Sequence, residues 1–160
     1  MIRLTNPPRD DVDSRNHWAS LWWPRVYRMA LAMTGNPADA EDLAQETLIS
    51  ALSAAERFRG ESSESTWLYS ILLHKTRRRK ARSVARLPVP SDSRDVDEAS
   101  LLLAALPVAQ RITAALYYVE DMTVREIACA LGVPQVTVRW RLFRARKRLR
   151  ESLIARRRHE

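Results

Sequence analysis

The sequence predicts an all-α protein of two small helical domains joined by a flexible linker. Only 3 of the 160 residues are glycine, and segments rich in Leu, Ala, Arg and Glu favour helices over sandwiches or barrels. A chain of this length fits one domain or two small ones and excludes a large enzyme scaffold. The division into two rests on residues 87–97, which hold prolines and turn-forming residues but no apolar periodicity.

The first domain is expected over residues 17–86, after a mobile N-terminal arm over residues 1–16. Its first helical pattern runs from about Trp18 to Thr34 and stops at Gly35. Pro24 is expected to break this helix near its start, because proline lacks the N–H group that a helix interior needs.

Two further helices complete the first domain. Asn36 followed by Pro37 is typical of a helix start and predicts a second helix over residues 37–57. Residues 57–65 contain a glycine and serines and are expected to form a loop, and a third helix begins at Thr66. The apolar positions of the three helices are Trp22, Val26, Ala30, Met33, Ala40, Leu43, Ala44, Thr47, Leu48, Ala51, Leu52, Trp67, Leu68, Ile71 and Leu72.

The second helix carries an acidic strip. Asp39, Asp42 and Glu46 are spaced i, i+3 and i+7, so they share one face, with Gln45 beside them. Such a strip repels DNA. It is therefore either an ordinary solvated helix face or a surface for a protein partner.

The second domain is expected over residues 98–160. A short helix near residues 96–106 precedes a helix that Pro107 opens and that runs to about Val119. The buried positions predicted for that second helix are Ile112, Ala115, Leu116 and Val119.

A helix-turn-helix motif follows. Thr123 and Glu126 have the spacing of a capping box, which starts a helix that ends at Gly132. Pro134 and Gln135 open a basic amphipathic helix, and in this motif the second helix enters the major groove of DNA. Plain helical hairpins share the pattern, but cations on one side favour DNA. The apolar stripe of the basic helix consists of Val138, Leu142, Ala145 and Leu149.

The charge pattern also indicates a nucleic-acid partner. The chain has 27 Lys and Arg against 19 Asp and Glu, a formal net charge of +8, and its pI is about 10.5. Seventeen of the 27 cations lie in two blocks, residues 74–86 and 139–158. Two cationic blocks suit two contact zones on a polyanion, and a pair of solvated helix faces is the plainer alternative. A membrane-surface helix is disfavoured, because arginines interrupt the apolar face of both blocks.

Metal, disulfide and membrane roles lack support in the sequence. The single cysteine, Cys129, cannot form an internal disulfide, and three scattered histidines give no zinc-ligand spacing. The longest apolar stretch, residues 101–106, is far shorter than the roughly 20 residues that cross a bilayer, and residues 1–18 lack an apolar signal core. A cytoplasmic protein without a cofactor is therefore expected.

Three stretches together carry a family resemblance. They are GNPADAEDLAQETLISAL at residues 35–52, FRGESSESTWLYSIL at residues 58–72, and residues 106–151 with the helix-turn-helix. In this order and at these separations, over roughly residues 20–153, the chain resembles bacterial sigma factors of the extracytoplasmic-function (ECF) group of the sigma-70 family. The resemblance implies sigma domains two and four, which bind core RNA polymerase and the minus-ten and minus-thirty-five promoter elements without catalysis. It also implies an anti-sigma partner.

The resemblance assigns residues to three surfaces. The helix that docks on the polymerase clamp corresponds to Asp39, Glu41, Asp42, Leu43, Gln45 and Glu46. The minus-ten surface, with serines at a flipped base and arginines at the backbone, corresponds to Ser62, Ser63, Ser65, Trp67, His74, Lys75, Arg77, Arg78 and Arg79. The minus-thirty-five surface corresponds to Arg125, Gln135, Val136, Thr137, Arg139, Trp140, Arg141, Arg144, Arg146 and Lys147.

Several positions depart from the family pattern. His74 and Arg78 stand where an Asn and an Asp are usual, and residues 64–65 are Glu-Ser instead of Phe-Arg. In the recognition helix Val136 and Trp140 take positions usual for Gly and Ser, so the promoter sequence does not transfer from relatives. Trp140 is expected to contact a thymine methyl or sugar, or to pack against a partner.

Two functions from different classes fit these features. One is an ECF-type sigma factor, and the alternative is a helix-turn-helix regulator that binds DNA through residues 107–153 without recruiting polymerase. An enzyme acting on nucleic acid lacks support, because the sequence has no carboxylate cluster with a ligating histidine, no glycine-rich phosphate loop and no nucleophile signature.

Overall fold

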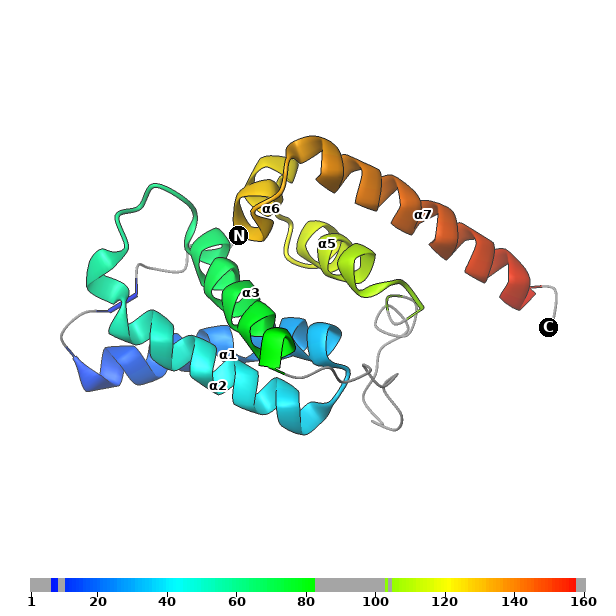
Figure 1. Ribbon diagram of the computed structural model, residues 1–160. Coiled ribbons are helices and arrows are strands. Elements are labelled where there is room, and N and C mark those ends of the chain that lie inside the picture. Colours follow the sequence, from blue (N-terminus) through cyan, green and yellow to red (C-terminus); the bar gives the residue numbers. More distant parts are fainter. Residues whose placement is uncertain (1–6, 9–10, 83–102, 104, 158–160) are drawn as a thin grey trace. The chain divides into compact units, whose positions relative to one another are not determined.

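The computed structural model describes residues 7–8, 11–82, 103 and 105–157, and every regular element among these residues is a helix. The all-α fold class predicted from the sequence is confirmed. The chain divides into two compact units, residues 1–86 and residues 87–160 (Figure 1).

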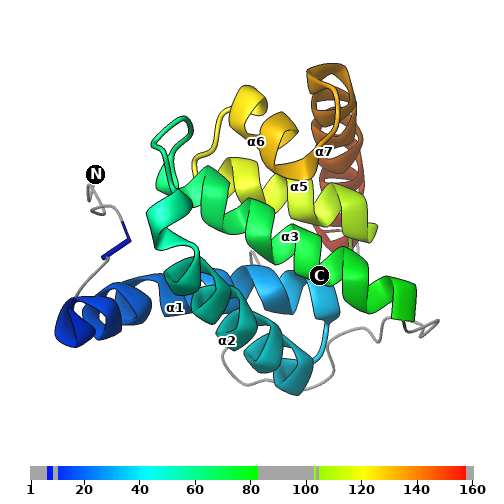
Figure 2. The same cartoon turned by 60° about the vertical axis from the view of Figure 1, so that its left-hand side comes forward.

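Three α-helices and one short 3-10 turn build the described part of the first unit. They are α1 (Val12–Thr34), α2 (Pro37–Ser53), η1 (Ala55–Arg57) and α3 (Glu64–Arg82). α2 packs against α1, and α3 packs against both (Figure 2). In their shared core the fully buried Trp22 ring meets the Tyr69 ring edge-on, with 6.4 Å between ring centroids. Such a pair adds about 0.5–1.5 kcal/mol to the burial of its two rings.

The apolar pattern locates this core with few exceptions. Of the apolar positions predicted for the first three helices, Leu52, Trp67 and Ile71 are half-buried and all the others are buried. Gly35, with φ 68°, ends α1 in the left-handed conformation that glycine adopts at no steric cost.

Helix α1 begins at Val12 rather than near Trp18, so residues 12–16, predicted as part of the arm, are helical. The early start comes from Asp11, whose carboxylate accepts a hydrogen bond from the backbone N–H of Ser14 at 3.0 Å. An aspartate at this position satisfies N–H groups that the first helical turn leaves without partners.

The break expected at Pro24 is wrong, because α1 continues through this residue. Trp22 and Val26, on either side of the proline, are both buried in the core of the unit. Their packing outweighs the roughly 3 kcal/mol that a proline costs inside a helix.

The other boundaries shift by a few residues. α2 ends at Ser53, and η1 replaces its predicted last turn, which brings Ala55 into the core. α3 begins at Glu64 rather than Thr66. Ser63 explains this start, because its hydroxyl oxygen accepts a hydrogen bond from the Thr66 N–H at 3.2 Å.

Three helices are described in the second unit: α5 (Val108–Tyr118), α6 (Val124–Leu131) and α7 (Gln135–Arg157). α7 packs against both α5 and α6 (Figure 1). Leu106, Ala114 and Ala145 form a core, against which Leu103 and Leu149 are partly buried.

Of two predicted features of this unit, the helix near residues 96–106 is described only at its end, and the burial of Val119 is not seen. Most of the helix expected near residues 96–106 lies outside the described residues, and its end closes a turn in which the Leu106 N–H donates to the Leu103 carbonyl at 3.0 Å. Val119, predicted to be buried, is exposed. α5 ends at Tyr118, and the chain turns away there through Asp121, whose φ is 51°.

The capping box that starts α6 gives a test of local stability. The Thr123 hydroxyl oxygen accepts a hydrogen bond from the Glu126 N–H at 3.2 Å, and the Glu126 carboxylate accepts one from the Thr123 N–H at 2.8 Å. We predict that Thr123→Ala costs about 1 kcal/mol of α6 stability and lowers the hydrogen-exchange protection of its amides about fivefold. Thr123→Ser keeps the hydroxyl and is the matched control. Equal protection in the alanine and serine variants would contradict the role given to the cap.

Candidate functional site

Carboxylates project from the solvent side of α2. Asp39, Asp42 and Glu46, which we call the acidic ridge, are all exposed, as are the neighbouring Glu41 and Gln45. The Asn36 side-chain oxygen accepts a hydrogen bond from the Asp39 N–H at 3.1 Å, which fixes the start of the helix below the ridge. Asp39 lies in the first turn of α2, where the helix dipole favours an anion.

Leu43 differs from its neighbours on α2. The resemblance places it in the surface that contacts the polymerase, but its side chain is 0% exposed. Leu43 lies four residues after Asp39 and three before Glu46, where the buried stripe of α2 borders the ridge, and its side chain packs into the core of the first unit and leaves no surface exposed to a partner. Its role is to hold α2 in place.

One ion pair joins the acidic ridge to the basic segment of α3. The Lys75 ammonium lies 4.0 Å from the Glu46 carboxylate, and the two side chains are 24% and 50% exposed. Exposed pairs of this kind contribute at most about 1 kcal/mol to stability. The pair matters more for the potential of the surface, because it moderates the negative charge at the C-terminal end of the ridge.

The loop before α3 is held by aromatic packing and by a helix cap. Phe58 is buried, and the centroid of its ring lies 5.0 Å from that of the Trp67 ring. The half-buried Trp67 on α3 therefore packs against the loop. Ser63 uses its hydroxyl as the cap of α3 and also lies 2.7 Å from the Thr66 hydroxyl. Ser62 and Ser65 are half-buried beside it. The loop serines predicted to contact a base therefore lie together, and the Ser63 hydroxyl already caps α3.

Sequence reasoning missed a buried polar contact at the start of α3. The Trp18 indole N–H donates a hydrogen bond to the Glu64 carboxylate, which ties α1 to α3. Burial raises the pKa of Glu64, and the hydrogen bond from Trp18 and the nearby charge of Arg25 only partly offset that rise. The signal in the sequence was the departure from the family pattern at residue 64, but nothing local identified Trp18 as the partner.

The predicted minus-ten cations on α3 are mostly exposed. His74, Arg77 and Arg78 lie on the surface, while Lys75 is half-buried beside Glu46. Arg79 is part of α3, but its side chain lies outside the described residues.

The helix-turn-helix forms as the sequence predicts. α6 ends at Gly132 with φ 62°, and the Val133 N–H donates to the Ala128 carbonyl at 3.1 Å. The chain then turns through Pro134 into α7, whose Val138, Leu142 and Ala145 are buried and whose Leu149 is half-buried. The opposite face of α7 is left for a ligand.

The structure places the predicted minus-thirty-five residues on two helices. Arg125 is exposed on α6. On α7, half-buried side chains border the exposed face: Thr137, Arg141 and Arg144. Of the predicted residues on α7, the exposed ones are Gln135, Val136, Arg139, Trp140, Arg146 and Lys147.

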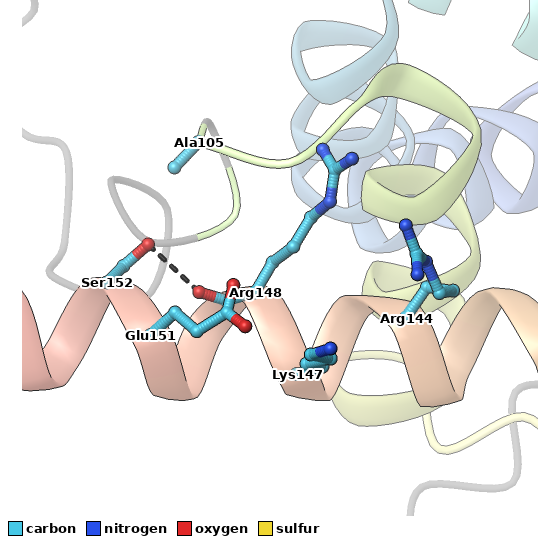
Figure 3. Close-up of a pocket in the computed structure, with 6 residues that line it drawn as sticks. All are labelled: Ala105, Arg144, Lys147, Arg148, Glu151 and Ser152. Carbon is cyan, nitrogen blue, oxygen red and sulfur yellow. Dashed lines mark hydrogen bonds between the residues drawn. The ribbon is translucent and has the colours of Figure 1, made fainter.

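A shallow cleft of about 560 Å³ lies further along α7. It is lined by Ala105, Arg144, Lys147, Arg148, Glu151 and Ser152 (Figure 3). The Ser152 hydroxyl is occupied, because it donates to the Arg148 carbonyl at 3.0 Å. Three cations and one acid line the cleft, so its charge favours an anion over a cation.

Within the described residues, no cluster of three or more His, Cys, Asp or Glu side chains has the geometry to hold a metal ion. The same part of the chain contains no helix that is long and apolar enough to span a membrane.

Comparison with known families follows the division into two units. The family model for sigma-70 region 2 matches residues 20–86, and that for sigma-70 region 4 matches residues 97–149. The chain belongs to the sigma-70 family. Region 2 thus carries the acidic ridge and the loop before α3, and region 4 carries the helix-turn-helix.

Curated relatives place this sigma factor in the ECF group. It is 34% identical over 148 residues to the ECF RNA polymerase sigma factor SigE of Mycolicibacterium smegmatis, a match that covers 81% of this chain and 57% of SigE. It is 27% identical over 177 residues to SigW of Bacillus subtilis, covering 94% of this chain and 95% of SigW. The match to SigE therefore spans little more than half of that relative.

Solved structures agree on the fold. The sigma factor RpoE of Bartonella quintana, crystallised with the anti-sigma factor NepR, superposes with a TM-score of 0.69 and 27% identity over 89% of this chain and 98% of RpoE. CnrH, solved with the cytosolic domain of CnrY, gives a TM-score of 0.68 at 24% identity over 91% of this chain and 90% of CnrH, which bears on the fold alone.

The raised pKa of Glu64 predicts how region 2 responds to pH. In the folded chain Glu64 keeps its proton to a higher pH than in the unfolded chain, so its contribution to stability falls as pH rises from below 4.5 through the raised value and is constant above it. Glu64→Gln removes the titration, while its amide oxygen can still accept from Trp18. We predict that the variant gains stability relative to the parent between pH 4 and pH 7.

Urea unfolding followed by tryptophan fluorescence checks this prediction, because four of the five tryptophans lie in the first unit. The exposed Glu56 provides the control substitution, Glu56→Gln. Parallel pH profiles for the parent and Glu64→Gln would show that burial of the Glu64 carboxyl has no energetic effect.

Proposed function

We propose that this sigma factor binds core RNA polymerase and directs transcription initiation at a particular set of promoters. The first unit would dock on the polymerase through Asp39, Glu41, Asp42, Gln45 and Glu46 and would hold the opened minus-ten element. The second unit would read the minus-thirty-five element. Membership of the ECF group supports this proposal, and RNA synthesis itself is assigned to the polymerase.

The observation that carries the proposal is the separation of charge within a strongly basic protein. A chain with net charge +8 presents a ridge of exposed carboxylates on α2, while its cations gather on α3 and α7. A negative ridge repels a nucleic-acid backbone and is complementary to a basic protein surface. One ligand is therefore a protein and the other a polyanion.

At the minus-ten element, Ser62, Ser63, Ser65 and Trp67 are proposed to line the site of an unstacked base. Loss of stacking costs a few kcal/mol, which hydrogen bonds and aromatic contact must replace. His74, Lys75, Arg77, Arg78 and Arg79 would then attract the phosphates of the open strand.

At the minus-thirty-five element, the first turns of α7 are proposed to face base edges. Gln135, Val136, Thr137, Arg139 and Trp140 lie in those turns. The proposed phosphate contacts are Arg125, Arg141, Arg144, Arg146 and Lys147.

We further propose that an anti-sigma protein regulates the chain, as NepR binds RpoE in the structure of that relative. The activity belongs in the cytoplasm, where bacterial promoter DNA and RNA polymerase are found.

In vitro transcription with purified core polymerase and a library of bacterial promoters tests the proposal. The expected result is core binding together with transcripts that start at a shared promoter sequence. DNA binding without core binding or transcripts would overturn it in favour of a helix-turn-helix regulator that does not recruit polymerase.

The acidic ridge gives a quantitative prediction. Asp39→Lys combined with Asp42→Lys should weaken core binding about tenfold or more, because both charges would then repel a basic partner. The matched control is Asp13→Lys with Glu56→Lys, which makes the same change in net charge at exposed acids away from α2. Core affinity measured by fluorescence anisotropy should fall in the first double variant only. Equal losses in both would mean that net charge, rather than the ridge, determines binding.

Removal of Arg139 and removal of Lys147 from α7 should affect DNA binding in different ways. Arg139→Ala is predicted to weaken promoter binding by about 1–3 kcal/mol and to relax preference at one base pair. Lys147→Ala is predicted to weaken binding to all sequences alike and to lower the salt dependence by about one charge. Titration of promoter and mismatched duplexes at several salt concentrations separates the two. Identical behaviour of both variants would contradict the division between base and phosphate contacts.

A further inference from the structure

We propose that Trp140, together with Val136, recognises thymine methyl groups in the major groove, so that the minus-thirty-five element of this protein requires thymine at one or two defined positions. This inference deepens the proposed function and rests on the role of α7 as the recognition helix. It names the chemical group that two unusual residues of that helix select.

The first observation is that these two apolar side chains are turned away from the protein's own core. Val136 is 67% exposed and Trp140 is 56% exposed, whereas Val138 and Leu142 on the opposite face are 0% and 4% exposed. The spacing i, i+4 puts Val136 and Trp140 on one face in adjacent turns. More than half of each residue stays exposed in this unit, which leaves that apolar surface available to a ligand.

The second observation is that Trp140 has a cationic neighbour. The guanidinium carbon of Arg144 lies 5.8 Å from the centroid of the Trp140 ring, within the range of a cation–π contact. Arg144 is itself half-buried, so it offers the ring a fixed support. A guanidinium over one face of the indole restrains the ring and leaves its edge and its other face to meet a ligand.

The chemistry of the major groove identifies that ligand. Among the bases, only thymine presents a methyl group there, and apolar side chains contact it favourably. Val136 and Trp140 supply such contact in the first two turns of α7, and in a helix-turn-helix these turns face base edges. Recognition of guanine or adenine through hydrogen bonds would require donor or acceptor groups at these positions, and the valine side chain has neither.

The surrounding charge favours DNA over an apolar surface. Arg139 lies between the two apolar residues in the sequence and Lys147 lies two turns beyond Trp140, and both are exposed. Phe143, 59% exposed and three residues after Trp140, extends the same apolar face by one turn, and this apolar strip among cations is complementary to a thymine step bordered by phosphates. A lipid or an apolar protein groove would instead leave these cations without partners.

The experiment replaces thymine by uracil, which removes only the methyl group. A duplex is selected from a random pool with the full chain bound to core polymerase, or with the full chain alone if no complex forms. Each thymine of the selected minus-thirty-five element is then changed singly to uracil. At one or two positions the affinity of the parent should fall about fourfold, the value expected for one buried methyl group.

Three variants make the assignment specific. Trp140→Ser should bind the thymine duplex about fourfold more weakly or worse and should lose its sensitivity to uracil at the same positions. Trp140→Phe keeps an apolar ring and should retain part of that sensitivity. Lys147→Ala, the matched control, should weaken binding while keeping the full sensitivity. Circular dichroism checks that the helices of each variant are intact.

The outcomes separate this inference from the proposed function. If the complex forms and transcribes but no uracil substitution matters, or if Trp140→Ser stays as sensitive as the parent, methyl recognition is wrong and the sigma-factor function stands. Unchanged DNA binding by Trp140→Ser would assign the exposed ring to a protein partner and would likewise overturn the inference. If no complex forms, the proposed function fails, and uracil sensitivity with the full chain alone still decides methyl recognition.

Discussion

Each helix of this protein can bury only one of its faces, because each small unit has only a few helices with which to enclose a core. The apolar stripe fixes which face turns inward, and the opposite face is thereby committed to solvent or to a ligand. On α2 the outward face carries carboxylates, and on α7 it carries cations around Val136 and Trp140. The same constraint that folds the chain therefore also displays its binding groups.

Charge then distinguishes the two kinds of surface. The exposed carboxylates of α2 suit a basic protein surface, while α7 presents a largely cationic face to a polyanion. Within the first unit, the contact between Glu46 and Lys75 joins the acidic ridge of α2 to the basic segment of α3. Under the proposed function, substitutions at this pair would change the charge of both surfaces, whereas a substitution at Asp39 or Lys147 would change one.

Sequence reasoning was most successful where a local rule decides the structure. The cap formed by Asn36, the capping box of Thr123 and Glu126, and the turn at Gly132 all form as predicted, because each depends on residues within a few positions of one another. The family was also identified correctly from motifs and their separations. Periodicity identified the buried stripe of α7, since helical spacing alone determines which residues share a face.

The failures came where distant residues compete. Pro24 was predicted to break α1, but burial of the tryptophan and valine on either side of it keeps the helix continuous. Leu43 was assigned to a partner contact by its place in a motif, although packing against other helices buries it completely. The hydrogen bond from Trp18 to Glu64 joins residues of two helices and has no local signature. Tertiary packing, which no short window contains, decided each of these cases.

The Ser63 hydroxyl links helix order to ligand retention. It accepts the Thr66 N–H at the beginning of α3 and lies in the segment proposed to receive an unstacked base. A nucleotide that accepted the O–H of Ser63 would leave the helix cap in place, whereas one that displaced the Thr66 N–H from this oxygen would loosen the first turn of the helix. In the second case, a more stable cap at Ser63 would weaken the binding of the nucleotide by the free energy needed to break it.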